Sequence, residues 1–228
     1  DRDGKKWHKE ILVQNGARKR AAFSPELFFF NDTFWLTYSM SNGNSSGLLR
    51  SITGSANGPY EDVSHDKPLV KGINATLFRD PDGTFWYIWD NGKMRKMKSD
   101  LSGFEGGTIE MVIYGNRLNS NHVQLIFRNG DYVLTSSRWH GSGAKRGHAL
   151  RSEAQMRFDP DAQFDAVFYT GSSPTGPFRE VGLPVPHAGG GMLFEDFEKK
   201  LWLTFSGNND ASAPFRHDAA TVPVLQTS

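Results

Sequence analysis

Short apolar and aromatic runs alternate with polar turns along the chain, and one arrangement of them recurs four times. Each occurrence consists of an apolar pair, a polar turn and then a strand rich in aromatic residues. Asn-Asp, Asp-Gly and Asn-Gly dipeptides stand in these turns, and such residues tolerate the positive φ of tight hairpins. The pattern therefore predicts four β-hairpins, and the lack of a sustained 3.6-residue apolar period in the sequence predicts few helices. The hairpins are expected at residues 27–38, 77–89, 125–135 and 192–204.

The spacing of the hairpins is typical of a propeller. The equivalent positions Phe34, Phe85 and Tyr132 follow one another at intervals of about 50 residues, near the ~40–50 residues of a propeller blade. A second motif, with small and hydroxyl residues before Gly-Pro and an aromatic residue, recurs at 55–61 and 173–179. It predicts the turn into the outermost strand of a blade. A solenoid or a sandwich also spaces strands this way, but two repeated motifs in each period favour an all-β propeller.

Four hairpins do not complete the expected ring. Residues 7–13 have the pattern of an outer strand from a preceding blade, and the inner strands of that blade do not precede them in the sequence. An open propeller would leave sheet edges unpaired. We therefore expect one propeller domain over residues 1–228 that is truncated at its N-terminus, with the rest of a first of five blades upstream of Asp1.

Composition removes several classes of function. The 26 basic and 25 acidic residues give a net charge of +1 at pH 7, so charge does not favour nucleic acid or an anionic membrane as a partner. No apolar run of the sequence approaches the ~18 residues that span a bilayer. The sequence contains no cysteine, which excludes disulfides and thiolate metal sites. We expect neither a nucleic-acid nor a membrane partner.

The hairpin sequences resemble those of glycoside hydrolase family 43. The resemblance implies a five-bladed β-propeller, its first blade largely missing from this chain, with an active site at one mouth of a central tunnel. It also implies a secreted or periplasmic glycosidase that hydrolyses a terminal sugar from a polysaccharide or oligosaccharide. It implies no organic cofactor, and a central cation such as calcium is compatible with it. The motifs that carry it are SPELFFFN at 24–31, NATLFRDPDG at 74–83, SPTGPF at 173–178 and HAGGGMLF at 187–194.

Three carboxylates catalyse hydrolysis in that family: a base, a residue that modulates the pKa of the acid, and a general acid. The resemblance assigns the base to the missing first blade, the modulator to Asn74, and the acid to the vicinity of Asn121 and His122. Neither position that is present carries a carboxylate. Asn74 can hold a hydrogen bond, but it lacks the charge that would shift the pKa of a neighbour.

A histidine offers another source of the proton. The imidazole of His122, with an ordinary pKa near 6.5, suits proton donation at neutral pH. The related glycoside hydrolase family 117 is similar in using a histidine as its acid. We therefore predict His122 as the candidate acid, with Asn74 positioning it. The alternative is that Asn121 and His122 only hydrogen-bond a sugar or line the tunnel.

Further residues are predicted to shape the sugar pocket. Glu26 begins an innermost strand, so its carboxylate either holds sugar hydroxyls or is a charge on the rim. Trp139, beside Arg138 at a strand end, either stacks on a sugar or packs between blades. His187 precedes three glycines, which permit the close approach of a ligand or another backbone. The acidic DPDG segment at 80–83 is instead typical of a turn.

These residues predict a glycosidase-like propeller with carbohydrate as its partner. The alternative is a non-catalytic carbohydrate-binding propeller descended from such enzymes. A third class is a propeller that serves only as a platform for other proteins, and it would require an exposed apolar patch.

Overall fold

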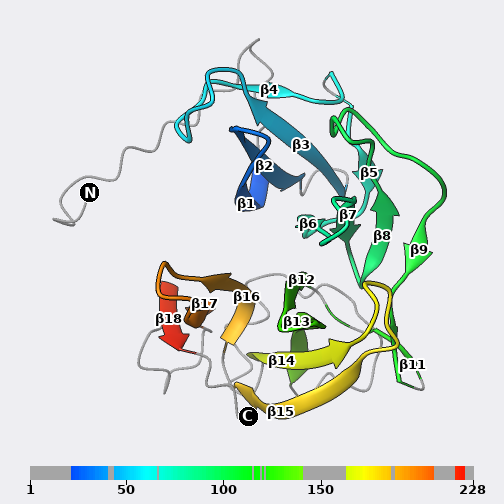
Figure 1. The fold of residues 1–228 in the computed structure, drawn as a ribbon, viewed down its shortest axis with the longest axis vertical. Helices are drawn as coiled ribbons and strands as arrows, with labels where there is room; N and C mark the ends of the chain where they lie inside the picture. Colours follow the sequence, from blue (N-terminus) through cyan, green and yellow to red (C-terminus); the bar gives the residue numbers. More distant parts are fainter. Residues whose placement is uncertain are drawn as a thin grey trace, which may run out of the picture.

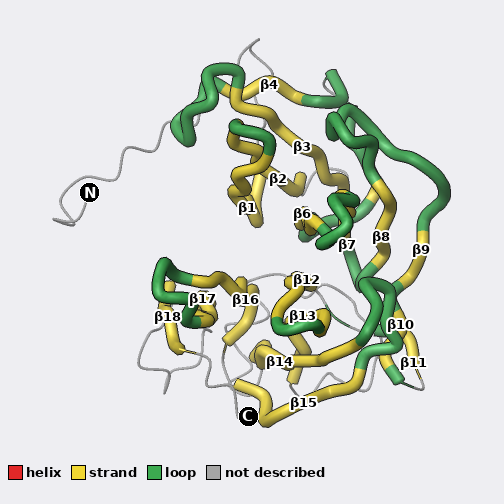
Figure 2. The backbone as a smooth tube through the Cα atoms, in the orientation of Figure 1, coloured by secondary structure: helices red, strands yellow, loops and turns green. Residues whose placement is uncertain are grey.

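The computed structural model of the chain is an all-β fold (Figures 1 and 2). The part of the chain that it describes contains strands, turns and loops and no helix, so no helix there is long and apolar enough to cross a membrane. The predicted strand at 7–13 and the residues Asn121 and His187 lie outside this part. The described residues are 22–40, 44–65, 67–114, 116–118, 120, 122–140, 163–185, 188–207 and 219–223.

The first two sheets follow the chain from its blue end (Figure 1). In the first, the strand order is β1-β2-β3-β4, and β5 also pairs with β3; in the second, it is β6-β7-β8-β9. All the pairs are antiparallel. The strands are β1 (Ala22–Phe30), β2 (Thr33–Met40), β3 (Ser45–Ser51), β4 (Tyr60–Asp62), β5 (Val70–Lys71), β6 (Thr76–Arg79), β7 (Phe85–Trp89), β8 (Lys93–Lys96) and β9 (Ile109–Glu110).

The remaining strands form two further sheets and a short ribbon. The order is β12-β13-β14-β15 in the third sheet and β16-β17-β18 in the fourth, while β10 and β11 pair with each other. The strands are β10 (Val112–Ile113), β11 (Asn116–Arg117), β12 (Val123–Arg128), β13 (Asp131–His140), β14 (Gln163–Gly171), β15 (Arg179–Val185), β16 (Ala188–Glu195), β17 (Leu201–Gly207) and β18 (Ala219–Pro223).

The four sheets lie around a common centre in chain order, and the first strand of each lies nearest that centre (Figure 1). Each of the four predicted hairpins forms the two inner strands of one sheet. Their turns have the predicted geometry, with a φ of 52° at Asn31, 57° at Asp32 and 53° at Asn129. The segments at 55–61 and 173–179 lead into β4 and β15, the outermost strands of their sheets. The prediction of a propeller is confirmed, and each sheet is a blade.

Large side chains fill the space between neighbouring blades. Trp35 of β2 packs with Leu77 and Phe85 of the second blade, and all three are buried. A second cluster joins the second blade to the third, where Phe78 and Ile88 pack against Leu125. Aromatic strands therefore serve mainly to pack blades together, as a propeller requires.

The acidic turn at 80–83 is structural, as the sequence indicated. The backbone of Asp80 pairs with that of Thr84, which closes the β6–β7 hairpin. The Asp80 carboxylate accepts a 2.7 Å hydrogen bond from the Tyr132 hydroxyl of the third blade and a 3.4 Å hydrogen bond from the Trp86 indole. Asp82 is exposed and accepts a hydrogen bond from the Thr84 N–H. Asp80 thus joins two blades, whereas Asp82 only stabilises the turn.

Candidate active site at the centre of the propeller

A bulge in β1 determines where Glu26 points. Phe23 pairs with Ser39 and Glu26 with Thr37, so β1 holds one more residue than β2 between these pairs. Ser24 lies in this interval with a φ of 45°, which a regular strand does not allow. A bulge of this kind re-aims the side chains beside it. The Glu26 side chain is consequently buried, with 4% of its surface exposed.

His122 immediately precedes β12, the innermost strand of the third blade. Its carbonyl accepts a 3.0 Å hydrogen bond from the Ser137 N–H of β13 and a 2.8 Å hydrogen bond from the Ser120 hydroxyl. The Ser120 hydroxyl also lies 3.1 Å from the Ser137 carbonyl, so its one hydrogen is shared between the two carbonyls. The backbone at His122 is thereby fixed to β13, which holds the imidazole in one place.

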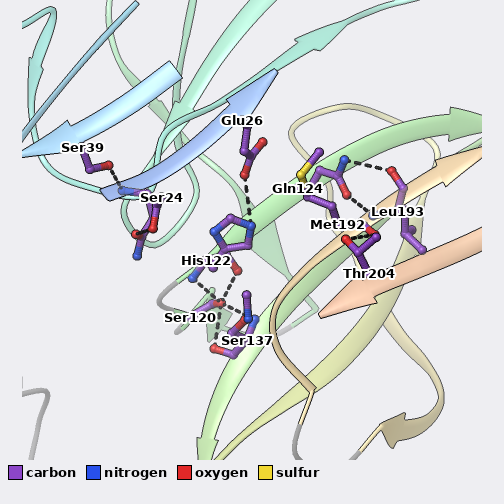
Figure 3. Close-up of polar contacts among 12 residues, drawn as sticks. Ser24, Glu26, Ser39, Ser120, His122, Gln124, Ser137, Met192, Leu193 and Thr204 are labelled. Atoms are coloured by element: carbon purple, nitrogen blue, oxygen red, sulfur yellow. Dashed lines mark hydrogen bonds and ion pairs between the residues drawn. The ribbon is translucent and has the colours of Figure 1, made fainter. Parts of the chain in front are cut away.

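Glu26 and His122 meet between two blades that are not neighbours in the chain (Figure 3). Nε2 of His122 lies 3.2 Å from Oε1 of Glu26. Burial raises the pKa of the Glu26 carboxyl to about 7. Burial also lowers the pKa of the His122 imidazole to about 4. Both shifts have the same physical cause, because a charged form is disfavoured away from water.

The chemistry of this pair follows from these shifts. Between about pH 4 and pH 7 the carboxyl of Glu26 keeps its proton and the imidazole of His122 stays neutral. In direct contact the two groups titrate as a unit rather than as separate residues. In this pH range the pair therefore consists of a protonated carboxyl group and a neutral imidazole, and it carries no net charge.

Asn74 is held beside the same bulge. Its backbone has a φ of 55°, and its side-chain Oδ1 accepts a 3.1 Å hydrogen bond from the Ser24 hydroxyl. The backbone N–H of Asn74 donates a 2.8 Å hydrogen bond to the hydroxyl of Ser39 on β2. The preceding residue, Ile73, donates its N–H to the Asp90 carboxylate at 2.8 Å. Ser24 and Glu26 thus connect one bulge to both Asn74 and His122.

The structure brings two predicted site residues, Glu26 and His122, into contact, and links a third, Asn74, to the same bulge through Ser24. Arg138 lies elsewhere on the third blade, where its guanidinium forms two hydrogen bonds, of 2.7 and 3.3 Å, with the Glu180 carboxylate of β15. The backbone of Trp139 pairs with that of Phe164, and its side chain lies outside the described residues. Roles for Arg138, Trp139, His187 and Asn121 in binding or catalysis stay predictions.

Sequence reasoning did not find the serine hydroxyls that support this site. Ser39 and Ser137 occupy equivalent positions in their hairpins, five residues after Phe34 and Tyr132. Ser39 accepts the N–H of Asn74, just before β6, and Ser137 accepts that of Gly190 in β16 at 2.8 Å, so each receives a hydrogen bond from another blade. Their equivalent positions in the repeated hairpin could have identified both serines from the sequence.

A central cation such as calcium stays a prediction, to which the described side chains at this position offer a single carboxylate. Calcium takes six to eight oxygen ligands, whereas Glu26 supplies one carboxylate, and that carboxylate faces an imidazole. Within the described residues, no group of three or more His, Cys, Asp or Glu side chains is placed to hold a metal ion.

Known proteins are similar to this chain in sequence and in architecture. A curated relative, the Beta-D-galactofuranosidase xynD of Aspergillus niger, is 28% identical over 161 residues, which cover 65% of this chain and 40% of the relative. A solved thermostable family-43 glycoside hydrolase superposes with a TM-score of 0.63 at 18% identity, covering 89% of this chain and 70% of that one. An exo-1,5-alpha-L-arabinanase from a bovine ruminal metagenomic library superposes with a TM-score of 0.62 at 14% identity, covering 90% and 78%.

The structural likenesses show the fold, a five-bladed β-propeller, of which four blades lie in the described residues. The family match extends much further along the sequence than any single motif, because residues 5–210 match Glycosyl hydrolases family 43. The chain therefore belongs to glycosyl hydrolase family 43.

Proposed function

We propose that the protein hydrolyses the glycosidic bond of a terminal sugar in a polysaccharide or oligosaccharide, at the site where Glu26, Asn74 and His122 meet. Family membership supports action on sugars. The named activities of similar proteins, a galactofuranosidase, an exo-arabinanase and a beta-xylosidase/alpha-arabinofuranosidase, favour furanose or pentose sugars as candidates.

One observation carries this proposal: the 3.2 Å contact between the buried Glu26 carboxyl and the His122 imidazole, beside Asn74. Glycoside hydrolysis needs a group that protonates the leaving oxygen and a second group that activates water. A carboxyl that is still protonated near neutral pH meets the first requirement. Two of the segments that lead into innermost strands, at Asn74 and His122, converge here with the bulge of β1.

In this proposal His122 passes the proton to the leaving-group oxygen from a neutral imidazole, because burial lowers its pKa to about 4 rather than leaving it near 6.5. Asn74 positions the reacting groups by hydrogen bonding. A carboxylate that activates water is not among these residues. We assign that role to an aspartate of the blade expected upstream, on the basis of the family resemblance. Secretion or export to the periplasm is proposed on the same basis, because polymeric glycans are encountered outside the cell.

A non-catalytic carbohydrate-binding propeller is the second candidate. The observation that favours it is the amide at Asn74, which cannot raise the pKa of an acid by its charge. The burial of His122, with 8% of its surface exposed, also favours it, because a general acid must reach its substrate. Binding without hydrolysis would then be the function of the same surface.

The two candidates are separated by assaying the full-length protein on aryl glycosides of β-D-galactofuranose, α-L-arabinofuranose and β-D-xylose. Removing a general acid typically slows hydrolysis by ~10²–10⁴-fold. We expect that loss in His122→Asn, with glycan affinity by calorimetry retained. The matched control is His65→Asn, an exposed histidine in a surface turn, which should behave as wild type. Hydrolysis at the wild-type rate in His122→Asn would contradict the assignment, and glycan binding without any cleavage by the wild type would select the binding module.

A further inference from the structure

The Glu26–His122 pair has one further hydrogen-bonding side chain beside it, Thr76, which lowers the pKa of Glu26 against the larger effect of burial. Both carboxyl oxygens of Glu26 and Nε2 of His122 are buried, and no hydrogen bond of good geometry from another described residue satisfies them. Their mutual contact at 3.2 Å is therefore the main polar interaction open to each. Buried polar groups need a partner, so the protonation of one residue has to match that of the other.

Because the His122 imidazole is neutral, it has two possible tautomers, and the protonation state of Glu26 decides between them. A neutral histidine carries one hydrogen, and the hydrogen bond at one nitrogen decides which nitrogen carries it. When Glu26 is protonated, its O–H donates to Nε2 and the ring hydrogen lies on Nδ1. When Glu26 is ionised, Nε2–H donates to the carboxylate and Nδ1 becomes an acceptor.

We propose that Glu26 is a positioning residue that sets which ring nitrogen of His122 carries the hydrogen, and that it thereby makes Nδ1 the donor to the sugar. The donor role rests on the proposed function, whereas the choice of tautomer does not. In the hydrolytic step, Nδ1–H passes its proton to the leaving oxygen as the glycosidic bond breaks, while a water that gives a proton to the base proposed above forms the new bond to the anomeric carbon. The Glu26 proton moves to Nε2, so the imidazole stays neutral and Glu26 is left as a carboxylate.

The surroundings favour this exchange near neutral pH. Burial raises the pKa of Glu26 to about 7, so its proton is present below that pH and lost above it. Among the described residues, the ionisable groups coupled to Glu26 include Tyr87 of β7, on which Tyr38 of β2 and Asp62 of β4 also act. Burial holds the pKa of Tyr87 well above its usual value, and Tyr38, Asp62 and Glu26 add to that shift, so Tyr87 stays neutral. The second and third blades contribute Thr76 and Gln124, which do not titrate.

The test is the tautomer of His122, measured by NMR on full-length protein labelled with ¹⁵N in its histidine rings. His122→Asn identifies the signals, and long-range ¹H–¹⁵N correlations distinguish Nδ1–H from Nε2–H between pH 5 and 9. We expect Nδ1–H at pH 5 and Nε2–H at pH 9, with a crossover about pH 7. In Glu26→Gln the crossover should vanish, because an amide does not titrate. Glu61→Gln, an exposed glutamate of β4, should keep it.

Two results would overturn the inference: a single His122 tautomer across this range in the wild type, or a crossover that persists in Glu26→Gln. The wild-type titration decides the matter even if Glu26→Gln does not fold. Hydrolysis and glycan affinity do not enter this readout. An inactive protein that shows the crossover would therefore refute the proposed function alone, and an active one without it would refute only the role of Glu26.

Discussion

The Ser24 hydroxyl donates a 3.1 Å hydrogen bond to Oδ1 of Asn74, which joins the first blade to the segment leading into the second. Two residues later on the same bulged strand, Glu26 meets His122. The Asn74 amide is thus connected, through Ser24 and the two residues of backbone that follow it, to the Glu26–His122 pair. A change of charge at position 74 should therefore change the pKa of that pair.

Asn74→Asp tests this coupling. The Ser24 hydroxyl can donate to a carboxylate as it does to the amide oxygen, so the new side chain is accommodated. A nearby negative charge disfavours the ionised form of Glu26 and raises its pKa above about 7. We expect the alkaline limb of the hydrolysis profile, and the His122 tautomer crossover, to move to higher pH.

The control for that variant is Asn57→Asp, which makes the same change in an exposed turn of the first blade. It should leave both profiles where the wild type has them. If Asn74→Asp moves neither profile, position 74 is not coupled to the pair.

The pair also predicts how stability depends on pH. Glu26 has its pKa raised from 4.5 to about 7, so the folded protein binds the extra proton between these values. Its contribution to stability is present below pH 4.5 and is lost as pH rises to about 7. His122 has its pKa lowered from 6.5 to about 4, so the unfolded chain binds the extra proton and stability rises with pH over that window. The two slopes oppose each other in the wild type.

Single variants should reveal each slope. Each shift corresponds to roughly 3 kcal/mol when fully expressed. In Glu26→Gln, the free energy of unfolding should rise between pH 4 and 6.5, and in His122→Gln it should fall between pH 4.5 and 7. Urea unfolding followed by tryptophan fluorescence at several pH values measures both. Glu61→Gln should reproduce the flatter wild-type profile, and parallel profiles for all four proteins would show that the pair is not buried as described.

Much of the fold could be predicted because its signals are local. Each hairpin places its apolar residues and its turn within a dozen positions, as at Phe28, Asn31 and Phe34. Resemblance in these hairpins was sufficient to indicate the family. The segment between the third hairpin and β14, and the chain before residue 22, carry no comparable pattern.

The site was only partly predictable, because it depends on contacts between residues distant in sequence. Glu26 and His122 were each singled out, Glu26 as a sugar contact and His122 as an acid. Their pairing depends on the bulge between Phe23 and Glu26. Pro25 is a residue that strands tolerate at a bulge, but it does not tell which way the Glu26 side chain points. The pKa of Glu26 lies above that of His122, the reverse of their ordinary order, because both side chains are buried. This burial exists only once the blades are assembled. The sequence alone therefore identified Glu26 and His122 as candidate site residues but not the contact between them.

The equivalent serines of two hairpins offer a test of how blades are joined. Ser39 and Ser137 are buried, and each accepts a hydrogen bond from a backbone N–H of another blade or of the residues just before it. Leaving a buried donor without its acceptor costs ~1–3 kcal/mol. Ser39→Ala and Ser137→Ala should each lower the free energy of unfolding by about that amount, and the double variant by about the sum.

Ser102→Ala provides the comparison for these variants, because Ser102 lies exposed in a turn of the second blade. It should change the free energy of unfolding by less than about 0.5 kcal/mol. Equal effects for Ser39→Ala and Ser102→Ala in urea unfolding would show that the hydroxyls do not hold the blades together.

Two aspartates in one turn provide a final matched comparison. Asp80 is buried and accepts hydrogen bonds from Tyr132 of the third blade and from Trp86, whereas Asp82 is exposed and contacts only Thr84 among the described hydrogen bonds. Asp80→Ala leaves the hydroxyl of the half-buried Tyr132 without its acceptor, so we expect a loss of ~1 kcal/mol in unfolding free energy. Tyr132→Phe removes the same hydrogen bond from the other side, and the double variant should lose less than the two single losses combined. Asp82→Ala should unfold close to the wild-type urea concentration. A larger loss for Asp82→Ala than for Asp80→Ala would mean that the turn, and not the joint between blades, depends on this acidic segment.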